Sequence, residues 1–335
     1  MIPRIEKSRH TPAWQTALTQ AVGSVDELLA LLHIDAADPD IRRFNRDFPL
    51  RVPRGFVARM EAGNIHDPLL RQVLPLLEED RLHTDFLPDP LREADAMPVP
   101  GLLHKYRGRA LLTLTGACAI HCRYCFRRHY PYASANPLSG NLAQAIEYLA
   151  AHTEIRELIL SGGDPLTLPD SRLAALTREL AEITHLQTLR LHTRLPVVLP
   201  ERIDDRLLAW LGEQPQRVVM VIHCNHPNEI DTSVAGALGK LGQAGVLLLN
   251  QSVLLRGIND VAGTLIRLSE TLLAAGVLPY YLHQLDRVQG AAHFEVSDSA
   301  AHTLMDSVHA ALPGYLVPRL VRELPDFPGK YPLWP

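Results

Sequence analysis

The stretch Cys118-Ala-Ile-His-Cys122-Arg-Tyr-Cys125 places three of the chain's four cysteines within eight residues, in a C-x3-C-x2-C spacing. Three thiolates can hold three irons of a [4Fe–4S] cluster, whereas a cluster that only carries electrons normally has four protein ligands. One iron would then stay open for a small molecule. The fourth cysteine, Cys224, stands far from the others in the sequence, and we expect it to be an inert buried thiol.

A zinc site and a disulfide framework are the alternatives for this motif. His121 lies between two of the cysteines, so a Cys3His zinc site is possible, but structural zinc usually takes paired ligands from two separate clusters. Disulfide frameworks are typical of short secreted chains, and this chain has 335 residues. We therefore favour the iron–sulfur cluster.

The cysteine spacing, with an aromatic residue (Tyr124) before the last cysteine, resembles the radical S-adenosylmethionine (SAM) superfamily. In that superfamily the amino and carboxylate groups of SAM chelate the open iron. One short motif is only moderately specific, so the rest of the chain has to agree with it.

Composition and charge exclude several classes of protein. The chain is 47% hydrophobic and 21% charged, and its formal net charge of −4 argues against a nucleic-acid partner. No apolar run reaches the length of a membrane span, and the first ten residues contain no apolar signal-peptide core. We expect no membrane partner and a cytoplasmic location, where clustered thiols stay reduced.

The order of expected elements predicts an α/β fold. Residues 13 to 80 are expected to be helical, and the prolines of 86–101 are typical of a linker. Beyond them, short apolar runs alternate with helical stretches, which indicates a parallel sheet with helices outside. The runs are 110–115, 157–161, 188–192, 217–223, 246–254 and 278–284, and the helices are 141–151, 171–183, 203–212, 232–243, 262–275 and 297–311.

Six such units are too few for a closed eight-stranded barrel, so we predict a partial, crescent-shaped parallel β/α barrel of the radical SAM type. Residues 1–100 would form an N-terminal helical segment with its linker, 101–315 the barrel and 316–335 a C-terminal segment. Ligands of parallel α/β sheets bind beyond the carboxyl ends of the strands. The cysteine motif, a glycine pair after the second run and Asp286 after the sixth all fall at such ends.

The glycine pair belongs to Ser161-Gly162-Gly163-Asp164-Pro165. By itself this segment would be read as a turn, but paired glycines also let a ligand approach the backbone closely. After a cluster motif it resembles the segment that binds the methionine part of SAM. His223 and Gln251 also stand at strand ends, and we assign them to the same cofactor site.

Only four of the 33 basic residues are lysines: Lys7, Lys105, Lys240 and Lys330. A desolvated lysine can form a Schiff base with pyridoxal phosphate (PLP). Lys330 lies in a turn bounded by proline and glycine, and without further context it would be interpreted as a solvated tail residue. Lys240 falls within a helix, and Lys105 belongs to His104-Lys105-Tyr106-Arg107-Gly108-Arg109, whose cations and ring suit a phosphate and a pyridine.

Over residues 100–335 the chain resembles the lysine 2,3-aminomutase family. The resemblance rests on segments 118–128, 161–166, 192–200, 226–230, 250–259, 279–286 and 329–330. The N-terminal segment and the length resemble the bacterial subfamily that makes (R)-β-lysine for the modification of elongation factor P. The resemblance implies an isomerase that uses a [4Fe–4S] cluster, SAM and PLP, acts on free L-lysine, takes an electron from a cytosolic low-potential donor and is linked functionally to an elongation factor P lysyl-ligase.

The same resemblance assigns roles to individual residues. Arg127 would bind the carboxylate of the substrate lysine through a bidentate pair, and Asp286 would hold its distal ammonium. Glu323 stands where the family has a shorter aspartate, and Lys105 where it has an arginine on the phosphate. The cluster ligands would be Cys118, Cys122 and Cys125; the PLP residues Lys330, Lys105, Tyr106 and Arg109; and the SAM residues Ser161, Gly162, Gly163, Asp164, His223 and Gln251.

Two departures from the family pattern concern zinc. Val261 replaces a zinc-ligand cysteine, and the chain ends at Pro335 without the cysteine-bearing extension of the larger enzymes. We therefore expect no structural zinc. A mutase for arginine or ornithine and a non-catalytic iron–sulfur sensor are the rival hypotheses.

Overall fold

The computed structural model describes residues 11–35, 38–43, 47–133, 135, 140–325 and 327–333. Its centre is a nine-stranded sheet whose strands follow one another in chain order. The seven strands from β2 to β8 are parallel, and β1 and β9 add antiparallel edges. The strands are β1 Leu102–Tyr106, β2 Arg109–Thr113, β3 Glu157–Ser161, β4 Thr188–Thr193, β5 Arg217–Ile222, β6 Leu247–Val253, β7 Leu278–His283, β8 Arg319–Arg322 and β9 Tyr331–Pro332.

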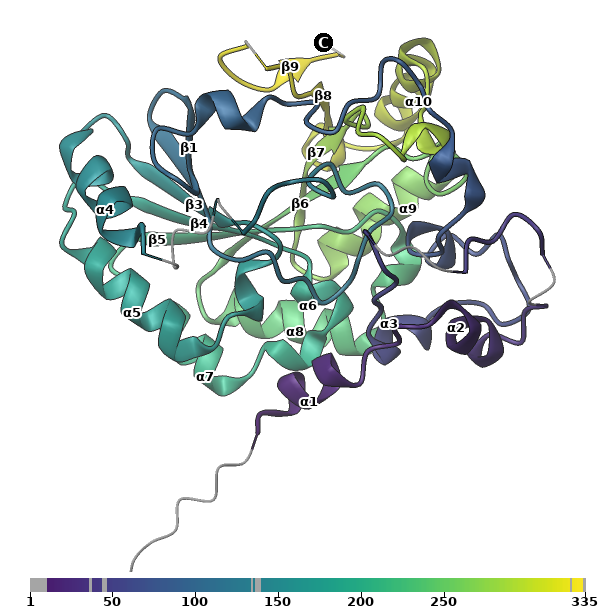
Figure 1. Ribbon diagram of the computed structural model, residues 1–335, viewed down its shortest axis with the longest axis horizontal. Coiled ribbons are helices and arrows are strands. Elements are labelled where there is room, and N and C mark those ends of the chain that lie inside the picture. Colours follow the sequence, from purple (N-terminus) through teal and green to yellow (C-terminus); the bar gives the residue numbers. More distant parts are fainter. Residues whose placement is uncertain are drawn as a thin grey trace, which may run out of the picture.

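The sheet curves without closing, and its helices lie on the outer side (Figure 1). This confirms the predicted partial barrel. The six expected strands and six expected helices are all present, with ends that shift by only a few residues. The helices are α4 Leu142–Ala151, α5 Asp170–Ala181, α7 Asp205–Gly212, α8 Thr232–Gln243, α9 Ala262–Ala274 and α10 Asp298–Ala311.

Four elements lack a clear sequence signal. β1 begins directly after the proline-rich stretch, β8 carries an arginine at each end, and β9 has only two residues. The short helix α6 (Leu195–Val198) contains a proline in its first turn. Short or charged elements show too little periodicity to be recognised.

The N-terminal part is less helical than predicted. It contains α1 (Ala13–Thr19), α2 (Val25–Leu31), α3 (Arg54–Val57) and the 3-10 helices η1 (Leu70–Gln72) and η2 (Leu77–Asp80), joined by irregular backbone. These pieces contribute side chains to the same hydrophobic core as the barrel, among them Trp14, Phe56 and Leu69. Contacts with the barrel, rather than a long helical periodicity, therefore explain the burial of these side chains.

The proline-rich stretch 86–101 is more than a linker. Leu87 forms a β-bridge with Val288 beyond β7, and the 3-10 helix η3 (Glu93–Ala96) contacts β1. The stretch therefore runs from the β7 side of the open barrel back to its first strand. Among the described helices, none combines the length and apolarity that a bilayer crossing requires.

Candidate active site

A cavity of about 460 Å³ opens at the carboxyl ends of the parallel strands, within the range of about 300–1,000 Å³ that small-molecule sites occupy. Every residue predicted for the site lines this cavity. They are Cys118, Cys122, Cys125, Ser161, Gly162, Gly163, Asp164, His223, Gln251, Lys105, Tyr106, Arg109, Lys330, Arg127, Asp286 and Glu323. Residues from strand ends and loops all along the sheet thus meet in one space.

The cysteine loop follows β2 and is fastened to the N-terminal part by the residues between its cysteines. The backbone N–H of His121 donates to the Arg51 carbonyl at 2.9 Å, and the His121 ring bonds the Pro49 carbonyl at 2.8 Å. Arg123 donates to Glu79 and, at 2.8 Å, to the Phe48 carbonyl. The three thiols are free and partly exposed. Their mutual proximity shows in the pKa of Cys125, which burial and the neighbouring Cys122 raise to about 11.

Three free thiols from one loop, all lining the cavity, provide the three protein ligands that an open [4Fe–4S] cluster takes. A cluster needs its cysteines spread around a cube, whereas a single ion needs ligands that converge on one point. Among the described residues, no group of three His, Cys, Asp or Glu side chains converges in this way.

The glycine pair packs against the cysteine loop. A Cβ on Gly162, whose φ is +127°, would lie 2.5 Å from the Thr115 carbonyl oxygen, and one on Gly163 would lie 2.4 Å from that of Ala117. The backbone N–H groups of Gly163 and Asp164 donate to these two carbonyls at 2.6 and 2.8 Å. The glycines are therefore required first by the close approach of two backbone segments, a reason that the sequence motif did not reveal.

Asp164 is held inside the protein. Its carboxylate accepts bonds from Leu166 N, Thr193 Oγ1 and Arg194 N, at 2.7 to 3.0 Å. Burial raises the pKa of Asp164 to about 6, although these hydrogen bonds favour the ionised form. The side chain thus joins the ends of β3 and β4 rather than reaching freely into the cavity.

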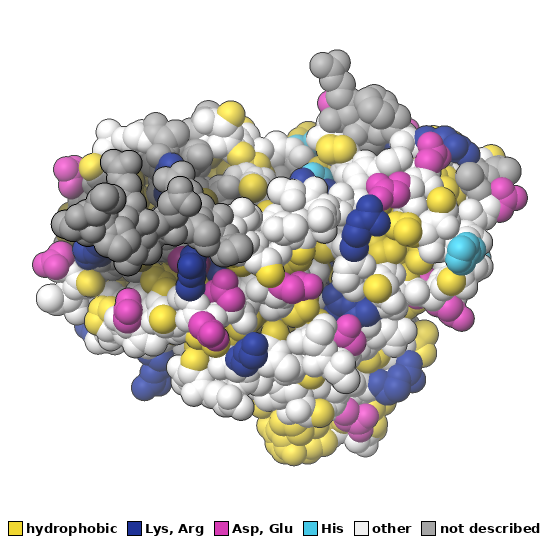
Figure 2. Space-filling view, turned by 90° about the horizontal axis from the view of Figure 1, so that it is seen from below, with side chains coloured by type: hydrophobic (Ala, Val, Ile, Leu, Met, Phe, Trp, Pro, Cys, Tyr) yellow, Lys and Arg dark blue, Asp and Glu magenta, His cyan; other side chains and the backbone are white. Residues whose placement is uncertain are grey.

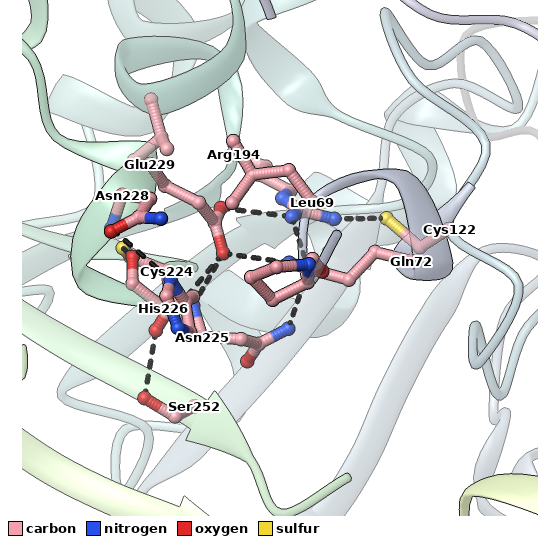
Figure 3. A network of polar contacts seen from close by, with 12 residues as sticks. Leu69, Gln72, Cys122, Arg194, Cys224, Asn225, His226, Asn228, Glu229 and Ser252 are labelled. Atoms are coloured by element: carbon pink, nitrogen blue, oxygen red, sulfur yellow. Dashed lines mark hydrogen bonds and ion pairs between the residues drawn. The ribbon is translucent and has the colours of Figure 1, made fainter. Parts of the chain in front are cut away.

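A polar network surrounds Arg194, the residue after β4 (Figure 3). Its Nη1 donates to Cys122 Sγ at 2.7 Å and to Tyr124 Oη at 2.8 Å. Its Nη2 donates to Gln72 at 2.6 Å and to Glu229 at 2.9 Å. Cys224, predicted to be buried, is fully buried, and its N–H donates to Asn250.

Three histidines of the cavity have ring nitrogens without a partner among the described residues: His192, His223 and His283. Burial, followed by the charges of Arg194 and Arg127, lowers the pKa of His223 to about 3, and burial likewise lowers the pKa of the other two rings. They are therefore neutral near pH 7. Because buried polar atoms are normally satisfied, these nitrogens fit a cavity that receives a polar ligand.

Glu323 lies among cations and a phenol in the lining of the cavity. Its carboxylate pairs with Lys330 and accepts from Tyr106, and Lys105 Nζ lies 3.2 Å away. Burial alone would raise the pKa of Glu323, but Lys330, Tyr106 and Lys105 lower it to about 2. Glu323 thus contacts the residues predicted for PLP as well as lining the cavity. Lys105 and Glu323, which both differ from the residue that the family has at their position, contact each other.

Asp286 follows β7 and has no side-chain hydrogen bond or ion pair among the residues that the structure describes. Burial, together with the carboxylates of Glu323 and Glu93, raises its pKa to about 7, against the opposing effect of Lys330 and Lys105. An unpartnered carboxylate of raised pKa is suited to a cationic ligand, whose arrival favours the ionised form.

Arg127 has a partner that the sequence did not predict. Its Nε and Nη2 donate to Glu93 at 2.8 and 2.6 Å, and its Nη1 donates to Ser161 Oγ at 3.0 Å. A guanidinium has five N–H donors, so one N–H remains on each of Nη1 and Nη2. Glu93 was overlooked because it lies in the stretch interpreted as a linker. His192 and Arg194 belong to segment 192–200, on which the family resemblance partly rests, but no role was assigned to either of them.

Comparisons with known proteins agree with this site. The radical SAM superfamily pattern matches residues 112–225. The chain is similar to L-lysine 2,3-aminomutase of Escherichia coli (strain K12), with 50% identity over 322 residues that cover 96% of this chain and 94% of that protein. The enzyme of the same name from Haemophilus influenzae is 47% identical over 332 residues, which cover 98% of both chains. That of Buchnera aphidicola is 42% identical over 327 residues, 97% of this chain and 96% of that protein.

Similarity of this extent, over almost the full length of this chain and of each relative, shows the family to which the chain belongs. A [4Fe–4S] cluster, SAM and PLP are the cofactors that it implies. The chain therefore belongs to the L-lysine 2,3-aminomutase family of radical SAM isomerases.

Proposed function

We propose that this protein is a PLP-dependent lysine 2,3-aminomutase, which moves the α-amino group of free L-lysine to C3 and yields (R)-β-lysine. One observation carries the proposal: a three-thiol loop and a lysine paired with an acidic group line the same cavity. The net change is an exchange of an amino group and a hydrogen between neighbouring carbons, so the reaction needs no net oxidant.

Cys118, Cys122 and Cys125 would hold the cluster. The free state of the thiols and the anchoring of the loop by His121 and Arg123 support this assignment. Ser161, Gly162, Gly163, Asp164, His223 and Gln251 would form the SAM side of the cavity. When bound, the cluster and SAM would supply an organic radical, and PLP would supply an aldehyde, conjugated to its ring, that can take up the substrate's amino group.

Lys330 would be the PLP lysine, with Lys105 and Arg109 near the phosphate and Tyr106 beside the ring. The Arg109 guanidinium already lies 4.7 Å from the centre of the Tyr106 ring, so a cation and an aromatic face are held together there. The ion pairs of Glu323 with Lys105 and Lys330 keep both amines within the cavity.

For the substrate, Arg127 would bind the carboxylate, and Asp286 and Glu323 the distal ammonium. Glu93 occupies one edge of the Arg127 guanidinium and leaves two N–H donors for an incoming carboxylate. The unpartnered Asp286 supports a cationic side chain and disfavours an acidic substrate. Arginine and ornithine share that cation and are the alternatives within the class.

The wider setting is also a proposal. A low-potential electron donor would reduce the cluster in the cytoplasm, and the product would serve an elongation factor P lysyl-ligase. The subfamily resemblance of the N-terminal segment supports this link.

Anaerobic incubation of the reconstituted protein with SAM, PLP, dithionite and either L-lysine, L-ornithine or L-arginine tests the function. We expect β-lysine from lysine alone, with the (R) enantiomer resolved by chiral chromatography. Turnover of ornithine or arginine in preference to lysine would reassign the substrate. Absence of SAM cleavage in a protein with an intact cluster would favour the sensor hypothesis.

A further inference from the structure

We propose that Arg194 sets the reduction potential of the iron–sulfur cluster by holding a positive charge and a hydrogen-bond donor on the sulfur of Cys122. The inference rests on the proposed role of Cys118, Cys122 and Cys125 as cluster ligands. It goes beyond that role because it concerns a residue outside the cysteine motif.

The contact itself is short and shielded from water. Arg194 is 5% exposed, and its Nη1 lies 2.7 Å from Cys122 Sγ. The same nitrogen donates to Tyr124 Oη at 2.8 Å. Since Tyr124 stands between Cys122 and Cys125 in the sequence, the guanidinium contacts the cluster loop at two neighbouring residues.

The other side of the guanidinium is fixed from behind. Nη2 donates to Gln72 Oε1 at 2.6 Å and to Glu229 Oε2 at 2.9 Å, and Glu229 is fully buried (Figure 3). Glu229 is itself held by the backbone N–H groups of Asn225 and His226, at 2.9 and 3.1 Å. The backbone N–H of Arg194 donates to Asp164 at 2.7 Å. The cation therefore has little freedom to move away from the sulfur.

Hydrogen bonds to cluster sulfurs, net charge and solvent exposure set the potential of an iron–sulfur cluster. Reduction adds a negative charge, which a neighbouring cation stabilises, and burial strengthens this attraction because the local dielectric constant is low. Arg194 should thus make the cluster easier to reduce. Its attachment to Gln72 in η1 means that the N-terminal part of the chain contributes to this effect.

The test is a potentiometric titration of the reconstituted full-length chain, followed by electron paramagnetic resonance of the reduced cluster. We expect Arg194→Gln to weaken the one-electron reduction about tenfold, a shift of ~59 mV to more negative potential. Arg194→Lys keeps the charge but loses the two-sided fork, so it should shift the potential in the same direction by less. Arg202→Gln is the matched control, because Arg202 is also fully buried but donates to Leu166, Leu168 and Asp170.

Unchanged potentials in both Arg194 variants would overturn the proposal, as would a shift to more positive values or an equal shift in Arg202→Gln. If Arg194→Gln fails to retain a cluster, the Lys variant decides, and a wild-type potential there overturns the proposal. Cys122→Ala separates this inference from the ligand assignment: a wild-type cluster spectrum in that variant would refute the assignment itself, whatever Arg194 does.

Discussion

Two buried carboxylates of this protein, Glu79 and Glu323, each contact two cations, but the side chains of the two clusters differ in how exposed they are. Glu79 meets the two arginines Arg123 and Arg128, and Glu323 meets the two lysines Lys105 and Lys330. The Glu79 side chain is 1% exposed and its partners are 0% and 4% exposed. The Glu323 side chain is 9% exposed, with partners at 17% and 25%.

This difference in exposure distinguishes a carboxylate that stabilises the framework of the fold, Glu79, from one that belongs to the candidate active site, Glu323. Arginine grips a carboxylate with a rigid fork and stays charged, whereas lysine is a single flexible point charge that can lose its proton and react. Glu79 therefore holds the cysteine loop against the N-terminal part through permanent contacts. The contacts of Glu323, by contrast, can be exchanged. A phosphate or an aldehyde can replace Glu323 on the lysines, and a substrate ammonium can replace a lysine on Glu323.

Removing Lys330 should have the largest effect on the site and little effect on the framework. Lys330→Ala removes the amine that we assign to PLP, so borohydride should fix no cofactor to the protein, and turnover should be lost. The unfolding midpoint should change little, because the side chain is partly exposed and a partly exposed ion pair such as Lys330–Glu323 contributes little to stability. Peptide mapping of the wild type should locate the reduced label at Lys330.

Lys240→Ala, on the exposed face of α8, is the control and should retain both label and turnover. Recovery of the label at Lys105 would reverse the assignment of the two amines that face Glu323.

Neutralising the two carboxylates should lower the free energy of unfolding by very different amounts in a denaturant titration. Glu79→Gln leaves two buried guanidinium groups without their anion, which should lower the free energy of unfolding by about 3–5 kcal/mol. Glu323→Gln should cost about 1 kcal/mol, because its partners can reach water. Glu78→Gln on the same 3-10 helix is the matched control, since the Glu78 carboxylate contacts Arg81 at 3.9 Å on the surface. Equal losses in the two test variants would abolish the distinction.

The sequence predicted the parallel strands and helices of the barrel well, because their apolar runs are long and regular. It also identified residues that line the cavity, some from their place at strand ends and others, such as Lys330 and Glu323, from the family resemblance. It could not predict how polar groups pair across distant segments. Glu93 with Arg127, Glu79 with Arg123, and Arg194 with Cys122 are contacts between residues 34, 44 and 72 positions apart. No local periodicity encodes such pairs, and only the packed fold brings them together.

The role proposed for Asp286 in the candidate active site can be tested through the pH dependence of lysine affinity. Since burial raises its pKa to about 7, the carboxylate is partly protonated near neutrality and should ionise when a cation binds. Lysine affinity should therefore fall about tenfold for each pH unit below 7. Asp286→Asn should weaken lysine binding by a factor of hundreds at pH 8, as expected for about 3–5 kcal/mol, and remove that pH slope.

Calorimetric titration of lysine into the PLP-loaded protein without reductant measures this binding apart from turnover. The pH dependence of folding stability has the opposite sign to that of lysine affinity. The folded pKa is raised, so the folded protein binds more protons than the unfolded chain between about pH 4 and 7, and this group's contribution to stability falls as pH rises through that window. A wild-type pH slope in Asp286→Asn would exclude Asp286 as the titrating group.

The smallest expected effect comes from giving Glu323 an arginine partner like those of Glu79. Lys105 reaches Glu323 with a single amine at 3.2 Å, and Lys105→Arg would offer that carboxylate a fork, as Arg123 offers one to Glu79. A firmer grip of about 1 kcal/mol should weaken lysine binding about fivefold, because Glu323 must leave it to meet the substrate ammonium. PLP affinity should not fall, since arginine binds phosphate at least as well as lysine does. In a Glu323→Gln background the same substitution should leave lysine binding unchanged, because the carboxylate that it would restrain is gone. An undiminished fivefold loss in that background would mean that residue 105 acts on the substrate by another route and that the exchange of partners at Glu323 is not what limits binding.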